Sequence, residues 1–203
     1  MKILTQTSLS RRQFTALGLG AVAASALPGQ AMALDVAQAR ALIDKLIGEI
    51  NGVINSGRSE QQMFANFEDI FARYADVNYI GLSALGPAGR QASSAQKQAF
   101  VKAYRRYISY KYGKRFREFI GGKIEVRDAR PLKSFFEVVS TAKLKGQSPF
   151  EVRWHVFDKS GKSQFFNIII EGVNMLSAER TEIGSLLDKN KGDINKLIAA
   201  IKV

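Results

Sequence analysis

Few side chains of this chain could perform catalysis. The one histidine, His155, could act as a general base, and Glu171 is the best-placed carboxylate, because it ends an apolar strand just before Gly172. No acid or hydroxyl partner can be assigned to His155 from the sequence. The 203 residues contain no cysteine, which excludes thiol catalysis and thiolate metal sites.

The motifs that usually mark an active site or a cofactor site are also missing. The chain has no G-x-S-x-G elbow, P-loop, H-E-x-x-H motif or dinucleotide fingerprint. Glu171, Glu179 and Glu182 are close in sequence, but nothing places two of them on one reacting bond. We therefore predict no enzyme activity, no cofactor and no metal. We interpret His155 as a structural or surface histidine and Glu171 as an anchor bonded to backbone or to an arginine. The alternative is a small α+β cavity enzyme that uses either residue as its base.

The stretch from Gly161 to Leu176 is the element around which these residues are arranged. It opens with a turn, continues as a strand that is apolar on both faces, and breaks at Gly172. Alternation predicts one face with Phe166, Ile168 and Ile170 and another with Phe165, Asn167, Ile169 and Glu171. Such a strand is buried between two core layers or has one face toward an internal cavity. The pattern alone leaves both interpretations open.

The segments before this strand read as helices. Apolar residues recur at helical spacing from Val36 to Ile54, and Ser59 with Gln62 forms a capping box for a second, aromatic-rich helix. Val77 to Gly89 indicates a short helical turn and a loop. The longest helix is expected from about Ala95 to Tyr112.

This longest helix combines an aromatic face with a basic one. Its apolar face consists of Phe100, Val101, Tyr104, Tyr107, Ile108 and Tyr112. Its basic residues are Lys97, Lys102, Arg105, Arg106 and Lys111, and Lys114 and Arg115 extend them. The pattern fits a core-facing stripe with a solvated back. It also fits tyrosines at a cavity mouth, with rings against lipid chains and hydroxyls toward a polar head group.

After Gly121 the pattern changes to strands. Lys123–Arg127, Phe135–Leu144 and Phe150–Phe157 alternate, and a tight turn connects the last of them to the strand described above. Ala178–Val203 returns to helix. Because the helices come first in the chain and the strands follow, the sequence predicts an α+β fold. The N-terminal helices pack on one face of a four-stranded antiparallel sheet, and C-terminal helices complete the chain.

The first 33 residues resemble a cleaved export signal. A positive segment and an apolar run precede Ala31-Met32-Ala33, which fits the small-x-small cleavage pattern. Ser10-Arg11-Arg12-Gln13-Phe14 resembles the twin-arginine motif, although Thr15 replaces the usual leucine, so ordinary export stays open. Residues 34–203 then form one domain with a formal charge of about +9, because the leader holds three basic residues and no acid. An exported basic protein is expected to meet anionic lipid surfaces or acidic partners rather than nucleic acid.

Two stretches of the mature chain form a recognisable pattern. The first is Phe166-Asn-Ile-Ile-Ile-Glu-Gly-Val-Asn-Met-Leu176, followed by a helix and Lys191-Gly-Asp-Ile-Asn-Lys-Leu-Ile198. The second runs from Ala92 through the aromatic helix. Together they resemble the MlaC / toluene-tolerance family: the first is similar to its C-terminal signature, and the second to its Gln-x-x-x-Phe helix, which ends on a tyrosine. The sequence departs from the family at Phe166-Asn167, where a Tyr-Asp pair is usual, and at Asn174, where serine is common.

The resemblance implies a periplasmic lipid carrier. Family members hold acyl chains in an apolar cavity between sheet and helices, with the head group near the mouth, and need no catalytic residue. Burial contributes ~0.8 kcal/mol per CH₂, so one long chain provides ample affinity. The predicted lipid-binding residues are Phe100, Tyr104, Tyr107, Ile108, Tyr112, Trp154, Val156, Phe166, Ile168, Ile170 and Val173. Those predicted to dock on partners or head groups are Arg105, Arg106, Lys111, Lys114 and Arg115.

The resemblance also implies partners and a pathway. The carrier would take phospholipid between an inner-membrane ABC transporter complex and an outer-membrane lipid complex, with transient contact to membrane surfaces, and so maintain outer-membrane lipid asymmetry. One branch of the family is associated with hopanoids, so a hopanoid or another lipid is the alternative cargo. A structural envelope protein whose apolar stripes are all core is a third hypothesis.

Overall fold

The computed structural model describes residues 34–117 and 119–202, so the expected leader lies outside the described residues. Along the chain the elements are α1 (Val36–Ile54), α2 (Glu60–Tyr74), α3 (Val77–Leu85), α4 (Ala88–Gln91), α5 (Ser94–Arg117), β1 (Lys123–Leu132), β2 (Phe135–Lys143), β3 (Phe150–Phe157), β4 (Gln164–Ile170), β5 (Val173–Asn174), α6 (Met175–Lys189) and α7 (Ile194–Ala200). Within this part of the chain, no helix is both long and apolar enough to cross a membrane.

Local sequence signals determine where the helices begin. The predicted capping box of Ser59 and Gln62 is confirmed at the start of α2, and both of its hydrogen bonds are present. Ser93 and Gln96 exchange the same pair of bonds before α5, at 3.2 Å and 3.0 Å. These side chains satisfy backbone N–H groups that lack a partner within the helix.

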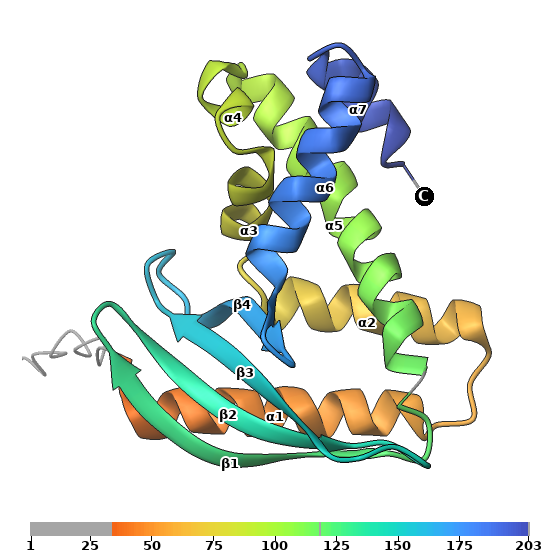
Figure 1. Ribbon diagram of the computed structural model, residues 1–203, viewed down its shortest axis with the longest axis vertical. Coiled ribbons are helices and arrows are strands. Elements are labelled where there is room, and N and C mark those ends of the chain that lie inside the picture. Colours follow the sequence, from red (N-terminus) through yellow and green to blue (C-terminus); the bar gives the residue numbers. More distant parts are fainter. Residues whose placement is uncertain (1–33, 118, 203) are drawn as a thin grey trace, which may run out of the picture. The chain divides into compact units, whose positions relative to one another are not determined.

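The strands form one antiparallel sheet in the order β1-β2-β3-β4-β5. The predicted meander is confirmed, with a fifth strand of two residues that the sequence analysis missed. Figure 1 shows α1 lying along β1 and β2, and α2 lies between α1 and α5. Helix α5 packs mainly on α2 and α3, while α6 joins α3 to β4. The fold is therefore α+β, with helices on one face of the sheet.

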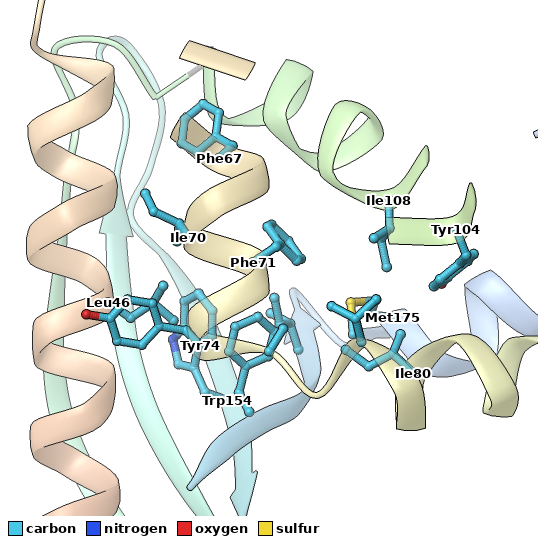
Figure 2. Close-up of a cluster of buried hydrophobic side chains, with 14 of the residues drawn as sticks. Leu46, Phe67, Ile70, Phe71, Tyr74, Ile80, Tyr104, Ile108, Trp154 and Met175 are labelled. Carbon is cyan, nitrogen blue, oxygen red and sulfur yellow. The ribbon is translucent and has the colours of Figure 1, made fainter. Parts of the chain in front are cut away.

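The main core lies between these helices and the sheet, where Trp154 and Phe71 meet side chains of α1 and α5 (Figure 2). Trp154 is only 2% exposed. Its indole Nε1 donates a hydrogen bond of 2.9 Å to Ser140 Oγ, which in turn donates to the carbonyl oxygen of Val152 at 3.0 Å. The polar atom of the ring is thus satisfied inside the sheet, and the rest of the ring is an apolar surface.

A bulge between β3 and β4 interrupts the alternation of side chains. His155 lies opposite Asn167, but the next residue, Val156, lies opposite Phe165, so Phe166 is the extra residue. Phe165 consequently points into the core, where it is 1% exposed. The prediction that Phe165 and Asn167 share one face of the sheet is therefore wrong, because the bulge lies between them.

The same bulge moves Phe166 to the outer face of the sheet. There its ring lies against Phe157, with 4.4 Å between the ring centroids. The prediction that Phe166 shares a face with Ile168 and Ile170 is therefore wrong. Period-two alternation fails where one strand contributes an additional residue.

Candidate functional site

A cavity of about 120 Å³ lies between the core face of the sheet and the C-terminal end of α5. We call it the sheet–helix cavity. Its apolar lining consists of Tyr112, Phe119, Ile124, Leu144, Phe150, Val152, Trp154, Ile168 and Ile170. Three polar side chains complete it, those of Arg115, Gln147 and Glu171. We call these three residues the rim, because all are exposed to solvent.

Strand pairing forms the apolar floor of the cavity. Val152 lies opposite Ile170 and Trp154 opposite Ile168, so all four side chains project from one face of the sheet. Alternation along β3 explains this arrangement, because the residues between them project to the other face. Such a surface can bind apolar groups but offers them no directional bond.

The turn between β4 and β5 positions one of the rim residues. Ile170 pairs with Val173, and the two residues between them, Glu171 and Gly172, have φ values of 49° and 82°. Positive φ at both central residues indicates a type I′ hairpin turn, which favours asparagine, aspartate or glycine. The backbone N–H of Glu171 donates to the carbonyl oxygen of Glu151 at 3.2 Å, which fixes the turn against β3.

The side chain of Glu171 is not the anchor that the sequence analysis expected. It makes no hydrogen bond or ion pair within the described part of the chain, and it lines the sheet–helix cavity instead. Arg115 is likewise without a hydrogen-bond or ion-pair partner among the described residues. The cavity therefore combines an apolar floor with one free cation and one free anion at its rim.

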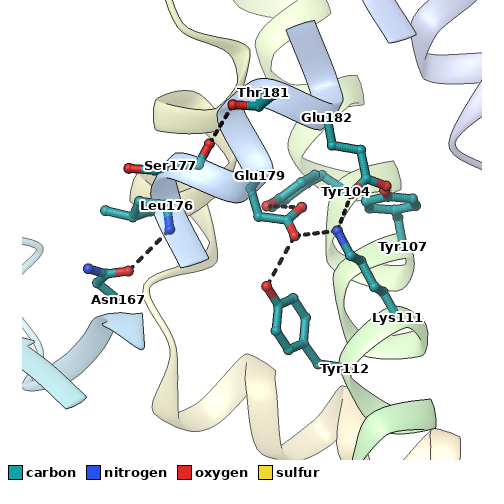
Figure 3. A network of polar contacts seen from close by, with 10 residues as sticks. All are labelled: Tyr104, Tyr107, Lys111, Tyr112, Asn167, Leu176, Ser177, Glu179, Thr181 and Glu182. Atoms are coloured by element: carbon teal, nitrogen blue, oxygen red, sulfur yellow. Dashed lines mark hydrogen bonds and ion pairs between the residues drawn. The ribbon is translucent and has the colours of Figure 1, made fainter. Parts of the chain in front are cut away.

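Three tyrosines of α5, Tyr104, Tyr107 and Tyr112, have hydrogen-bond partners on α6 (Figure 3). The carboxylate of Glu179, which is 0% exposed, accepts hydrogen bonds from the hydroxyls of Tyr104 at 3.1 Å and Tyr112 at 3.2 Å. Lys111 Nζ forms an ion pair with the same carboxylate at 2.7 Å. A buried carboxylate is stable only when it is paired in this way. In this structure both hydroxyls are bonded to Glu179 rather than directed to a cavity mouth, which was one of the two interpretations that the sequence left open.

A second acid, Glu182, extends these contacts toward solvent. We call Tyr104, Tyr107, Lys111, Tyr112, Glu179 and Glu182 the α5–α6 network. Glu182 accepts a hydrogen bond from Tyr107 and forms an ion pair with Lys111. Burial alone would raise the pKa of Glu182, but bonds from Lys111 and Tyr107 outweigh it and lower that pKa. Burial would likewise lower the pKa of Lys111, and its bonds to the two acids raise it. Burial raises the pKa values of Tyr104, Tyr107 and Tyr112, and the neighbouring carboxylates raise them further.

The structure brings together only part of the predicted lipid-binding set. Four of these residues line the cavity, Tyr112, Trp154, Ile168 and Ile170. Others lie in the core beyond the lining of the cavity, namely Phe100, Tyr104, Ile108 and Val156, each 0% exposed. Tyr107 is bonded to Glu182, Phe166 faces outward, and Val173 is 64% exposed and outside the lining.

The predicted docking residues also separate into groups. Lys111 forms ion pairs with Glu179 and Glu182, and its docking role stays a prediction. Arg115 belongs to the rim of the cavity. Arg105, Arg106 and Lys114 are exposed, and Lys114 Nζ lies 4.3 Å from the centroid of the Tyr110 ring.

Sequence reasoning missed several lining residues. Phe150 and Val152 alternate with Trp154 in β3, so the pattern that identified Trp154 could have identified them as well. Phe119, Leu144 and Gln147 lie outside the helices and strands, in connecting segments. No local pattern predicts that such residues meet at a cavity, because their positions depend on the packing of the whole fold.

His155 lies on the outer face of the sheet, away from the cavity. Its Nε2 is 3.3 Å from Glu137 Oε2, and its Nδ1 is 3.3 Å from the amide nitrogen of Asn167. Burial lowers the pKa of His155, although Glu137 opposes this shift. Asn167 Oδ1 in turn accepts from the backbone N–H of Leu176 at 3.1 Å, which ties β4 to the start of α6. His155 thus contributes to a structural network and shares no site with Glu171.

Known proteins resemble this chain in sequence and in fold. The model of the family described as "MlaC protein" matches residues 40–203. The intermembrane phospholipid transport system binding protein MlaC of Haemophilus influenzae is 25% identical over 135 residues, which are 64% of this chain and 62% of that protein. The chain thus spans somewhat less than two thirds of this relative.

A solved structure shares the fold. It is the phospholipid-binding protein from Ralstonia solanacearum in complex with a phospholipid, with a TM-score of 0.69. The match covers 80% of this chain and 94% of the other, at 16% sequence identity. At that identity the likeness establishes the fold.

Proposed function

Because this chain belongs to the MlaC family, we propose that it is a periplasmic lipid carrier that binds phospholipid acyl chains in the sheet–helix cavity. The observation that carries the proposal is the amphiphilic lining of that cavity. Its floor of Val152, Trp154, Ile168 and Ile170 is apolar, and its polar side chains are confined to the rim. A site for an amphiphile requires both parts, because the acyl chain binds to an apolar surface and the head group remains in contact with solvent at the rim.

The cavity must widen to take a whole acyl chain. Its volume of about 120 Å³ is close to that of an apolar cavity of ~150 Å³ that accommodates one benzene molecule. Helix α5, which contributes Tyr112 and Arg115, packs mainly on α2 and α3 rather than on the sheet. Separating its C-terminal end from the strands therefore breaks few contacts. Each CH₂ group that then enters contributes ~0.8 kcal/mol.

Export precedes this function. In our proposal residues 1–33 direct the chain to the periplasm by a twin-arginine-like signal and are removed after Ala33. Support comes from the cleavage pattern Ala31-Met32-Ala33. The intact mass of the protein isolated from the periplasm should correspond to a chain that begins at Leu34. A mass that includes the leader would contradict this step.

The exposed basic residues of α5 are proposed to dock the carrier on its partners, an inner-membrane ABC transporter complex and an outer-membrane lipid complex. Arg105 and Arg106 are adjacent and exposed, and the formal charge of residues 34–203 is about +9. Reversing both to Glu should slow lipid transfer between the two complexes and leave the bound lipid unchanged. Lys45→Glu on α1 is the matched control, since Lys45 is exposed on another helix. Unchanged transfer in the double variant would remove the docking assignment.

Native mass spectrometry of the gently purified protein, followed by organic extraction, tests the carrier proposal. We expect a stoichiometric mass shift that extraction releases as phospholipid. Ile170→Trp should abolish the shift, because the added ring occupies the cavity, whereas Ile169→Trp should preserve it, because Ile169 does not line the cavity. A released hopanoid would retain the carrier and change its cargo. A protein that is empty and refuses added lipid would overturn the proposal.

A further inference from the structure

The rim of the sheet–helix cavity carries two opposite charges that no other described residue neutralises. Arg115 comes from the end of α5 and Glu171 from the β4–β5 turn, and both line the cavity. Neither side chain makes a hydrogen bond or an ion pair within the described residues, not even with the other. The amide of Gln147 lies at the same rim and offers both a donor and an acceptor. Free charges at the edge of an apolar cavity are groups that a ligand can use.

The backbone at Glu171 supplies an independent observation. Its φ of 49° lies in the left-handed region, which disfavours residues with a Cβ atom, and glycine or asparagine would fit the same turn with less strain. Strained residues persist where the surrounding structure enforces them, and they concentrate at ligand sites. Here the strained turn places a carboxylate at the rim, where it stabilises nothing else in the described protein.

We propose that this rim selects zwitterionic phospholipids whose head group carries an ammonium group. The phosphate would lie near the guanidinium of Arg115, and the ammonium near the carboxylate of Glu171. Arginine is suited to phosphate because its planar fork donates two parallel hydrogen bonds. The inference rests on the proposed function, since it concerns the head group of the lipid held in the same cavity.

The charges of the rim predict that lipids with other head groups bind more weakly. A head group with a phosphate but no cation satisfies Arg115 and is repelled by Glu171. A neutral polycyclic lipid such as a hopanoid leaves both charges without a partner. Because both residues are exposed, each contact should change binding by no more than about fivefold, the upper range for exposed ion pairs. The preference should also weaken as salt is added, because salt screens exposed charges.

A competition experiment tests this inference. The purified protein is incubated with vesicles holding equal amounts of phosphatidylethanolamine and phosphatidylglycerol with identical acyl chains, and native mass spectrometry counts each bound lipid. We expect a two- to fivefold excess of the ethanolamine lipid at low salt. Glu171→Gln should remove the excess, because the ammonium group of the ethanolamine lipid loses its partner. Arg115→Gln should lower the binding of both lipids.

Two further variants separate head-group recognition from a structural role. Glu171→Gly suits the left-handed turn, so it should lose the preference while the protein remains at least as stable. Lys114→Gln is the matched control, because Lys114 neighbours Arg115 but does not line the cavity, and it should leave the ratio unchanged.

The failures of the two proposals can be told apart. Bound lipid with no preference, or with a preference that Glu171→Gln leaves intact, overturns the selection and leaves the carrier standing. An excess of phosphatidylglycerol overturns it as well. A protein that binds neither lipid contradicts the proposed function itself.

Discussion

Lys111 and Arg115 lie one turn apart on α5, but their charges have different surroundings. Lys111 is paired with the buried Glu179 and with Glu182, and so joins α5 to α6. Arg115 has no ion-pair partner in the described chain and borders the sheet–helix cavity. The paired charge of Lys111 thus stabilises the arrangement of α5 and α6, whereas the unpaired charges at the rim are available to a ligand. The same side-chain chemistry thus serves two purposes, and burial decides which.

The largest effect that we expect is a loss of folding stability at alkaline pH, caused by titration of the α5–α6 network. The pKa values of Tyr104, Tyr107, Tyr112 and Lys111 are raised by burial of the tyrosines and by the carboxylates beside all four residues. The folded protein therefore keeps these protons where the unfolded chain has begun to lose them. This stabilisation is complete below about pH 10 and is lost as the pH rises further.

Urea unfolding at several pH values should show this loss. The free energy of unfolding should fall steeply above about pH 10, and Tyr112→Phe should reduce the slope, because one titrating group is removed. A free energy that stays level well above pH 10 would contradict the assignment of a structural role to this network.

Removal of the buried acid is the next largest effect. Glu179→Gln removes the charge that Lys111 and two tyrosine hydroxyls share, and should lower the free energy of unfolding by about 2–3 kcal/mol. The control is Glu182→Gln, since the side chain of Glu182 is 44% exposed, and it should cost less than about 1 kcal/mol. Equal losses in urea unfolding would show that burial does not distinguish the two acids.

Replacement of each cation by methionine contrasts them directly. Lys111→Met should lower the free energy of unfolding by about 1–2 kcal/mol, because it leaves the buried carboxylate of Glu179 with only its two tyrosine donors. The free energy of unfolding of Arg115→Met should stay within about 0.5 kcal/mol of the wild-type value, because Arg115 has no ion-pair partner among the described residues. Lipid occupancy should respond in the opposite order, with a decrease for Arg115→Met only. The reverse pattern in unfolding and native mass spectrometry would exchange the two roles.

The smallest expected effect concerns the strained turn. Glu171→Gly should raise the free energy of unfolding by about 1 kcal/mol, because glycine adopts a positive φ without strain. Lys191→Gly offers a control, since Lys191 has a φ of 57° and does not line the cavity. Both should raise the melting temperature, but only the first should alter the head-group preference. If both variants changed the head-group preference, that preference would depend on the stability of the protein and not on the rim carboxylate.

Much of the fold could be predicted from the sequence, because its signals are local. The apolar spacing from Val36 to Ile54 matches α1, and the capping residue Ser59 marks the start of α2. The alternation in Phe150–Phe157 places Trp154 on the core face. In each case the information lies within a few residues of the element that it determines.

Part of the candidate site could not be predicted, because it depends on pairing across the structure. The bulge that turns Phe166 outward exists only in the register between β3 and β4. The pairing of Lys111 with Glu179 joins residues 68 positions apart. A basic residue on a helix looks the same in the sequence whether it binds a buried acid or borders a cavity, so the sequence assigned Lys111 and Arg115 the same role.

The emission of Trp154 provides the most direct test of the central claim, that acyl chains bind in the sheet–helix cavity. Trp154 is the single tryptophan of the chain and lines the cavity floor, so its fluorescence reports on that site alone. Phospholipid with brominated acyl chains should quench this emission strongly, whereas the same lipid without bromine should not. Brominated lipid that binds by native mass spectrometry but leaves the emission unchanged would place the acyl chains elsewhere and contradict this account.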